Sequence, residues 1–486
     1  MFARILFGVF LAIQACAQQD QLAALYAEAQ QATAAGDQAR AAAKYEQIVK
    51  LAPTMAEAFA NLGNAYYWLA KTEQAANAFR QAIRLKPQLT GPHFLLGVMA
   101  FNQHSYEAAA GHLAAAEKLE PANLLVQAYL GYTDYARMRY AEAAKHLQLA
   151  ASEPGNADVL YQLSKAYGQL ARQSYNAVHT RFRDSLYDHL AQGHAHEAAH
   201  EWDAALESYQ KALKLAPGNV PLRHRIERVT AKISSTAYTA PAGNDELVDG
   251  SLAVLEAAPS GEKLQAMYQQ LLRANTAFVA RPSAESTYRA AEGFQSLAYL
   301  TSVRVLEETP ESHRAHQLKG ESLEAAGSND EAIAEYHKAI EANPELPGLH
   351  FTIANIYWKT NRLAEAAPEL RKELQIDPRN AQALYELGDV LADAGQNDDA
   401  ERCFTQALQL HPNLPEAHLG LDKIYSARSD YQKSLLHLRA AAKLDPLNGT
   451  PHYRMAALYR KMGMQQDAKA ELEIFERLKP AAQKAQ

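Results

Sequence analysis

Apolar residues recur along most of this chain at the spacing of amphipathic helices, in pairs separated by short polar turns. Residues 56–89, AEAFANLGNAYYWLAKTEQAANAFRQAIRLKPQL, show the pattern clearly. A first apolar stripe contains Leu62 and Tyr66, and a second contains Phe79 and Ile83. Residues three or four positions apart lie on one face of an α-helix. Each such stretch therefore predicts two helices that pack together through their apolar faces.

A proline closes each of these units and returns at a fixed interval. The interval is 34 residues in two runs: Pro53, Pro87 and Pro121, then Pro310, Pro344, Pro378, Pro412, Pro446 and Pro480. A fixed period in this range is typical of a helical solenoid, in which each repeat contacts only its neighbours. We therefore expect an all-α solenoid, with each proline stopping the second helix of its repeat.

The repeats are expected to form two arrays. The first covers residues 22–219, with a degenerate part at 157–185, and the second covers residues 283–482. A shift of 127 residues aligns parts of the two arrays without a gap, for example Tyr161 with Tyr288. Between them, residues 220–282 break the period and are expected to hold a capping helix and a linker. The alternative for the helix near residues 220–233 is a basic surface that binds a partner.

Small residues recur where two helices must approach closely. Glycines of the first helices are expected to face alanines of the second helices: Gly63, Gly97, Gly131, Gly320 and Gly388 would face Ala75, Ala109, Ala143, Ala332 and Ala400. Larger residues would fill the space around that contact. A large substitution at Gly131 or Ala332 should then overpack a core, at a cost of about 1–3 kcal/mol.

The order aromatic–Leu–Gly–Tyr on the first helix and Ala, Phe/Tyr, Ala, Pro on the second resembles the tetratricopeptide repeat. The resemblance covers most of the chain. It implies a right-handed superhelix of antiparallel helix pairs, whose concave groove is lined by first helices and binds peptides or proteins. It also implies a scaffold and not a catalyst.

In that geometry each groove would present aromatic and polar side chains. The first array would offer Asn64, Tyr67, Trp68, Phe101, Asn102, Tyr132 and Tyr135. The second would offer Asn355, Trp358, Tyr385 and Asp389, with Glu321, Glu324, Asp393, Lys423, Arg460 and Lys461. A few aromatic anchors can carry most of the energy of peptide binding. The alternative is that the rings only fill space between adjacent repeats. We expect the two grooves to differ, and the first lacks the cations with which chaperone-binding relatives hold a terminal carboxylate.

One motif suggests an enzyme. His196-Glu197-Ala198-Ala199-His200 spells HExxH, which places two zinc ligands one helical turn apart with a glutamate as general base. The repeat frame argues against this function. His196 occupies a packing position between helices, and His200 occupies the position at which a first helix ends. We expect no metal and no other cofactor, and a zinc-dependent hydrolase is the third interpretation of the chain.

Composition and the N-terminus add the remaining expectations. The net charge of −7 and the absence of a basic stripe argue against nucleic acid as a partner. No apolar run beyond residue 20 approaches the roughly 20 residues that cross a bilayer. Arg4, an apolar run at residues 5–13 and Ala15-Cys16-Ala17 predict a signal peptide at residues 1–17. The alternatives are a lipid anchor at Cys16 and an uncleaved anchor. We expect a periplasmic or secreted protein.

The sequence therefore favours a non-catalytic scaffold that binds peptide or protein partners in concave grooves. The alternative is an adaptor subunit of an enzyme system, such as a glycosyltransferase complex, in which a partner supplies the catalysis. The segment outside the repeats, about 60 residues, is below the usual domain size and leaves no room for a catalytic domain, so any catalysis would have to come from a partner.

Overall fold

The structure, a computed structural model, describes residues 19–234, 261–279 and 283–485. Within these ranges the chain consists of α-helices joined by short turns, without a strand, which confirms the predicted fold class. The predicted signal peptide with Cys16, and most of the predicted linker, lie outside the described residues. The chain forms two compact units, Met1–Pro310 (unit 1) and Glu311–Gln486 (unit 2).

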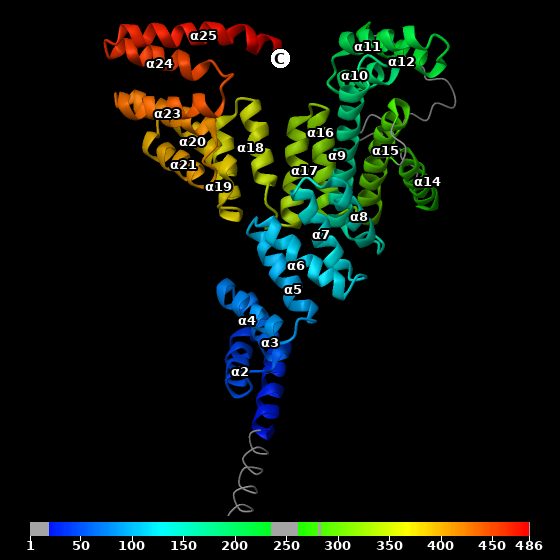
Figure 1. The fold of residues 1–486 in the computed structure, drawn as a ribbon, viewed down its shortest axis with the longest axis vertical. Helices are drawn as coiled ribbons and strands as arrows, with labels where there is room; N and C mark the ends of the chain where they lie inside the picture. The colour runs from blue at the N-terminus through cyan, green and yellow to red at the C-terminus, as the bar shows by residue number, and fades with distance from the viewer. Residues whose placement is uncertain (1–18, 235–260, 280–282, 486) are drawn as a thin grey trace, which may run out of the picture. The chain divides into compact units, whose positions relative to one another are not determined.

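Unit 1 begins with a helical stretch at residues 19–34. It continues with α2 (Gln38–Leu51), α3 (Ala56–Trp68), α4 (Thr72–Leu85), α5 (Thr90–Asn102), α6 (Tyr106–Leu119), α7 (Leu124–Ala136), α8 (Tyr140–Ala150), α9 (Ala157–Arg181), α10 (Leu186–Ala198), α11 (Trp202–Leu215), α12 (Val220–Ile233), α14 (Gly261–Val279) and α15 (Ala284–Glu308) (Figure 1).

Unit 2 contains α16 (His313–Ala325), α17 (Asn329–Ala342), α18 (Leu349–Lys359), α19 (Leu363–Ile376), α20 (Ala381–Asp393), α21 (Asn397–Leu410), α22 (Pro415–Ala427), α23 (Tyr431–Leu444), α24 (Thr450–Lys461) and α25 (Gln465–Ala485). Consecutive helices contact each other from α2 to α12 in unit 1 and from α16 to α25 in unit 2. This succession of neighbour contacts is the arrangement expected of a solenoid.

The prolines mark the ends of the second helices, as predicted. α4 ends at Leu85, two residues before Pro87, and the same offset recurs at α2, α6, α11, α17, α19, α21 and α23, whereas α8 ends at Ala150, four residues before Pro154. Proline cannot donate the backbone hydrogen bond that a continuing helix needs. The prediction is wrong at Pro480, because α25 continues through it to Ala485. There the proline lies in the last turns of the helix, where it removes a single backbone hydrogen bond.

The atoms nearest to the glycines of the first helices belong to a large side chain, which the prediction of a Gly–Ala contact did not include. A Cβ atom at Gly63 would lie 2.5 Å from the ring of Phe79, and one at Gly320 would lie 2.7 Å from Tyr336. At the other regular glycines, too, the nearest side chain is that of the residue sixteen positions further along the chain. These residues are Leu113 for Gly97, Leu147 for Gly131, Tyr209 for Gly193 and Phe404 for Gly388. At Gly131 the backbone oxygen of the predicted Ala143 also lies close, 3.3 Å from the added Cβ. The alanines are fully buried, but the ring or leucine is what needs the glycine.

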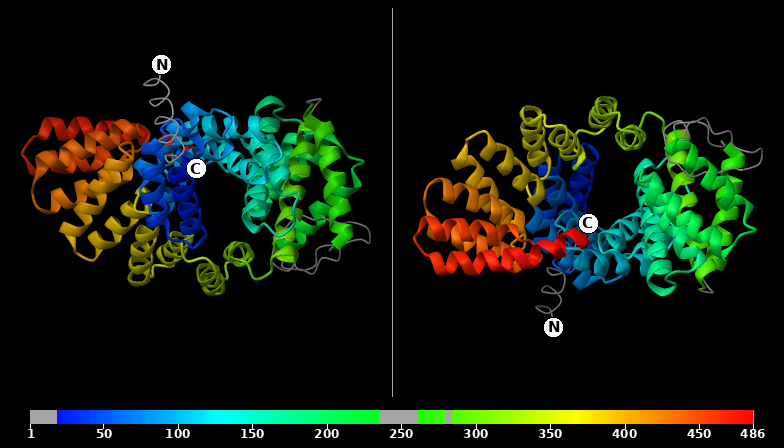
Figure 2. Two further views of the ribbon diagram at one scale, coloured as in Figure 1. Left: turned by 90° about the horizontal axis from the view of Figure 1, so that it is seen from below. Right: turned by 90° about the horizontal axis from the view of Figure 1, so that it is seen from above.

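Unit 1 contains a long-range helix pair that the repeat frame did not predict. α9 and α15 each have 25 residues, begin 127 positions apart, and pack against each other (Figures 1 and 2). The pairing is antiparallel: the Gly155 amide donates to Glu308 at one end, and Tyr175 meets Tyr288 at the other. In the middle, Tyr167 stacks on Phe294, its own equivalent under the shift. The two helices, which correspond under the 127-residue shift, are thus related to each other by a local two-fold axis.

This pair changes where the first array ends. α15 was predicted to open the second array at residue 283, whereas its contacts with α9 place it in unit 1, which extends to Pro310. The degenerate region predicted at 157–185 is the long helix α9. Because α9 is not followed by an ordinary second helix, α15 covers its apolar face instead.

A polar cluster fixes α15 to α9, α10 and α12. The hydroxyl oxygen of Tyr288 on α15 lies 3.4 Å from Nδ1 of His194 on α10. The ring of Tyr288 also contacts the ring of Tyr175 on α9. Burial lowers the pKa of His194 well below its usual value, and the guanidinium groups of Arg225 and Arg228 lower it further. The imidazole is therefore neutral at physiological pH, and the joint depends on hydrogen bonds and ring contacts.

In unit 2, histidine pairs recur between the two helices of a repeat. His316 bonds to Glu335 at 2.7 Å and His452 to Glu471 at 2.6 Å, in each case with a separation of 19 residues. The same positions in the α18–α19 repeat hold His350 and Glu369, 2.5 Å apart. The α22–α23 repeat has two histidines instead: the Nδ1 atoms of His418 and His437 lie 3.0 Å apart.

These pairs respond to acid in different ways. Burial disfavours the Glu369 carboxylate, but hydrogen bonds from His350 and Lys372 outweigh it and lower the pKa of Glu369 to about 2. Burial, reinforced by His418, lowers the pKa of His437 to about 4. The His418–His437 pair is therefore uncharged at neutral pH.

Candidate functional site

The first helices of adjacent repeats in unit 1 lie against one another, with α3 in contact with α5 and α5 with α7. At the end of α3, Trp68 leaves 71% of its surface exposed. Tyr67 meets it edge-on, with ring centroids 5.8 Å apart, and Asn64 is exposed one turn earlier. The structure thus brings together the three residues predicted for this helix.

Half-buried rings continue this surface over α5 and α7. Phe101 lies 5.9 Å from Tyr129 and 6.4 Å from Tyr132, measured between ring centroids. Phe94 lies 5.5 Å from Tyr129. The rings pack between adjacent repeats and still expose part of their surface. We call Tyr67, Trp68, Phe94, Phe101, Tyr129 and Tyr132 the aromatic face.

Two of these rings were missed in the sequence, and one predicted ring has another neighbour. Phe94 precedes Phe101 by seven residues, two helical turns, and that spacing could have revealed it. Tyr129 lies one turn before Tyr132. Tyr135, by contrast, lies 5.3 Å from the ring of Tyr140 at the start of α8. Asn102 is exposed at the end of α5, next to Phe101.

The helix positions that carry most of this face hold no charged side chain. The fifth, ninth, twelfth and thirteenth positions of each 34-residue repeat can be compared, counted from residues 56, 90 and 124 in unit 1 and from 313, 347, 381, 415 and 449 in unit 2. In α3, α5 and α7 they are Ala60, Asn64, Tyr67 and Trp68, then Phe94, Val98, Phe101 and Asn102, then Ala128, Tyr132, Tyr135 and Ala136. Aromatic rings, small apolar groups and amides occupy all of them.

The equivalent positions of unit 2 are rich in charge, and we call them the charged face. They are Gln317, Glu321, Glu324 and Ala325; Phe351, Asn355, Trp358 and Lys359; Tyr385, Asp389, Ala392 and Asp393; Leu419, Lys423, Ser426 and Ala427; and Tyr453, Ala457, Arg460 and Lys461. Ion pairs join neighbouring first helices: Lys359 lies 3.1 Å from Glu324, and Lys423 lies 2.5 Å from Asp393. Trp358 is 54% exposed among them.

A carboxyl group beside the charged face has an altered acidity. Burial and, to a smaller extent, the nearby Asp389 together raise the pKa of Glu386 to about 7, although a hydrogen bond from Gln382 partly offsets them. Burial also raises the pKa of Asp389 itself, which Lys423 at 3.9 Å partly offsets. Burial raises the pKa of Tyr385 to about 12. Sequence spacing gave no indication of Glu386, because its acidity depends on its surroundings.

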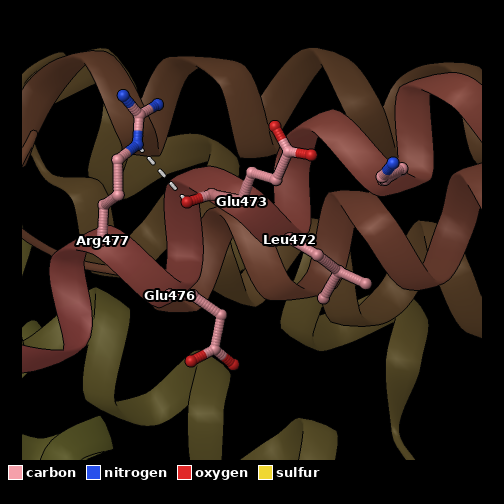
Figure 3. A pocket seen from close by; sticks show the side chains of 5 residues that line it. Leu472, Glu473, Glu476 and Arg477 are labelled. Carbon is pink, nitrogen blue, oxygen red and sulfur yellow. Dashed lines mark hydrogen bonds between the residues drawn. The ribbon is translucent and has the colours of Figure 1, made fainter.

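A separate depression lies on α25 (Figure 3). Its lining residues are Lys469, Leu472, Glu473, Glu476 and Arg477, all from that single helix. Arg477 bonds to the backbone carbonyl of Glu473. The depression is open, and its lining alternates in charge. It includes none of the predicted binding residues.

The HExxH residues take structural positions. α10 ends at Ala198, and His200 has a left-handed backbone with φ of 59°, so the two imidazoles do not follow each other on one helix. His196 bonds to Glu201 at 2.6 Å and is more exposed than the predicted packing position implies. Glu197 accepts hydrogen bonds from Tyr209 at 2.7 Å and from Arg228. It therefore joins α10 to α11 and α12.

Two further observations concern the described ranges as a whole. No helix there is both long enough and apolar enough to cross a membrane. Nor do three or more histidine, cysteine, aspartate or glutamate side chains gather there in an arrangement that could hold a metal ion.

Comparisons with protein families find repeat modules in both units. Residues 56–89 and 295–347 match models described as tetratricopeptide repeats. Residues 324–479 match the middle TPR-like domain of cilia and flagella-associated protein 70.

Comparisons with individual proteins find partial matches. Anaphase-promoting complex subunit 3 of Schizosaccharomyces pombe is 23% identical over 184 residues, 38% of this chain and 28% of that protein. DnaJ homolog subfamily C member 3 of Homo sapiens is 27% identical over 101 residues, 21% of this chain and 20% of that protein. The chain thus matches less than a third of the length of either relative.

Among solved structures, a match to the APC/C hetero-tetramer Cut9–Hcn1 spans 94% of this chain and 93% of the matched chain. The identity is 13% and the TM-score is 0.33. MamA covers 34% of this chain and 96% of that chain, with 19% identity and a TM-score of 0.33.

Proposed function

Because the chain is a tetratricopeptide repeat protein, we propose that it is an interaction scaffold that binds peptide or protein partners on the first-helix faces of its two units. One observation carries the proposal. Each unit exposes a tryptophan on these faces, Trp68 at 71% and Trp358 at 54%, where adjacent first helices meet. Large apolar side chains exposed on a continuous surface are typical of interaction sites.

The polar side chains of these faces support the proposal. The same faces carry polar groups that can orient a bound chain: Asn64 and Asn102 in unit 1, Asn355 and Lys359 in unit 2. Aromatic anchors supply most of the binding energy, and the polar groups around them supply specificity. The relatives support it by analogy, since one of them is named as a subunit of a multiprotein complex. We propose that the chain itself contributes no catalytic step.

The experiment is an affinity purification with the full-length chain, comparing Trp68→Ala and Trp358→Ala with two matched controls. The controls are Leu149→Ala and Leu436→Ala, which remove exposed apolar side chains from second helices of units 1 and 2. We expect each tryptophan variant to lose partners that the wild type and both controls retain. If all four variants recover the same partners as the wild type, the proposal is wrong.

We also propose that the protein works outside the cytoplasm, after cleavage of the signal peptide at residues 1–17. Mass spectrometry of the native protein tests this. A mature chain that starts at Gln18 supports the proposal, and an intact Met1 in a cytoplasmic fraction contradicts it. A diacylglycerol-modified Cys16 would support export but replace the soluble form with an anchored one.

A further inference from the structure

We propose that the aromatic face of unit 1 binds an uncharged, proline-rich segment in the polyproline II conformation, which runs across α3, α5 and α7. The inference rests on the proposed scaffold function and names the class of partner for one of the two faces. It follows from the charge of the face, from the spacing of its helices and from the side chains that it exposes.

The charge of the face excludes a charged ligand segment. The compared positions of α3, α5 and α7 carry no ionisable group apart from tyrosine hydroxyls. One charged group acts on the face: burial, then the Tyr67 hydroxyl and the Asp158 carboxylate, raise the pKa of Tyr129, and Asp158 already has an interaction partner. Elsewhere in the same repeats, Lys86 pairs with Glu57 at 2.7 Å, and Arg137 pairs with Glu107 at 2.8 Å. A lysine or glutamate of the ligand would lose water against the rings without gaining a counter-charge.

The spacing of the first helices matches one backbone conformation. Packed helices lie about 8–10 Å apart, and α3, α5 and α7 contact one another in sequence. A polyproline II chain has three residues per turn and advances about 9 Å in that turn. Every third residue of such a segment would therefore meet the next first helix. In a β-strand, same-face side chains recur about every 7 Å, so they would drift out of register with the helices.

The exposed side chains provide the two contacts that such a segment needs. The rings of Trp68, Phe101 and Tyr132 give flat apolar surfaces for proline rings, as in other aromatic-lined grooves that bind proline-rich segments. A polyproline II backbone makes no internal hydrogen bonds, so its carbonyl groups remain available. The exposed amides of Asn64 and Asn102 can donate to them. The conformation is also pre-formed in solution, so less entropy is lost on binding.

The test is fluorescence anisotropy with the full-length protein and a labelled, C-terminally amidated peptide of Pro-Pro-Ala repeats. We expect binding whose affinity changes less than about twofold between low and high salt, because no ion pair forms. A peptide of Gly-Ser-Ala repeats should bind about tenfold more weakly, and Trp68→Ala should weaken the proline peptide by about tenfold, equivalent to about 1.4 kcal/mol. Trp358→Ala, in unit 2, should leave its affinity unchanged.

The controls keep this inference separate from the proposed function. Trp68 is largely exposed, so its truncation should leave the circular dichroism spectrum and melting temperature unchanged. Phe101→Ala serves as a second variant within the ring cluster. No binding of the proline peptide, equal binding of the Gly-Ser-Ala peptide, or equal loss in Trp358→Ala would each overturn the inference. If Trp68→Ala instead loses a natural partner that contains no proline-rich segment, the scaffold function stands and this inference is wrong.

Discussion

The aromatic face of unit 1 and the charged face of unit 2 use the same helix positions for opposite chemistry. At the twelfth and thirteenth positions of the 34-residue repeat, the α3 repeat has Tyr67 and Trp68, whereas the α24 repeat has Arg460 and Lys461. The packing beneath the two faces follows the same rule, since a first-helix glycine receives a ring in both units, Phe79 at Gly63 and Phe404 at Gly388, or a leucine, as at Gly97 and Gly131. The difference shows that the packing positions and the face positions of a repeat vary independently. A solenoid can therefore change its ligand without changing its fold.

The largest effect should come from the shared packing, and it should be equal in both units. Gly63→Ala and Gly388→Ala would place a Cβ 2.5 Å and 2.7 Å from the rings of Phe79 and Phe404. We expect each to lower the free energy of unfolding by about 1–3 kcal/mol, because neither ring can move without overpacking the core. Hydrogen exchange localised to each repeat measures the loss.

The matched control is Gly111→Ala on α6, where an added Cβ would have no neighbour within 4 Å. It should stabilise the repeat by up to about 1 kcal/mol, since alanine favours a helix over glycine. A loss at Gly63 with none at Gly388 would show that the two units are not packed alike.

Acid should separate repeats within unit 2. The folded pKa of His437, about 4, lies below the usual value of 6.5. The unfolded chain therefore binds more protons, and stability falls as the pH drops from about 6.5 towards 4. Glu369, with a pKa of about 2, retains its contribution until the pH falls below about 4.5.

We therefore expect the opening free energy of α22–α23, measured by hydrogen exchange, to fall by about 1–2 kcal/mol between pH 7 and 5. This figure allows for solvent screening, because His437 is only partly buried. The α18–α19 repeat should remain unchanged over that range. His437→Leu should reduce the pH dependence of α22–α23, and the part that remains should come from His418, whose pKa burial also lowers. Equal acid sensitivity of both repeats would contradict this account.

Glu386 should show the opposite dependence, as an acid whose folded pKa is raised to about 7. The folded state binds the extra proton, so stability falls as the pH rises from about 4.5 to 7. Glu386→Gln should remove that fall and stabilise α20 by about 1 kcal/mol above pH 7. Urea unfolding at pH 5 and pH 8 compares the variant with the wild type. A variant that is less stable at pH 8 would show that the carboxylate is held by a favourable partner.

The smallest effect should come from the ion pairs of the charged face. Lys423, which bonds to Asp393, is substantially exposed. Lys423→Met should change the free energy of unfolding by less than about 1 kcal/mol, as surface ion pairs usually do. The difference between wild type and variant should disappear in high salt. A larger, salt-independent loss would mean that Lys423 is part of the packing.

The sequence predicted those features that depend on the repeat alone. The period placed the helix pairs and, up to Pro446, the ends of the second helices. It also placed His200 at a helix end and so argued against a zinc site. It did not predict the α9–α15 pair, because a contact between segments 127 residues apart leaves no periodic signal. The acidity of Glu386 and the ring contacts of Tyr129 were also missed, since both depend on neighbours from other helices.

The central claim is that two faces built on one framework bind different partners. Titration of the purified partners of the full-length protein, at low and high salt, against Trp68→Ala and Trp358→Ala tests it most directly. We predict that Trp68→Ala weakens only partners whose binding is insensitive to salt, and that Trp358→Ala weakens only partners whose binding falls with salt. If both variants weaken the same partner with the same salt dependence, the two faces do not have separate functions and the account is wrong.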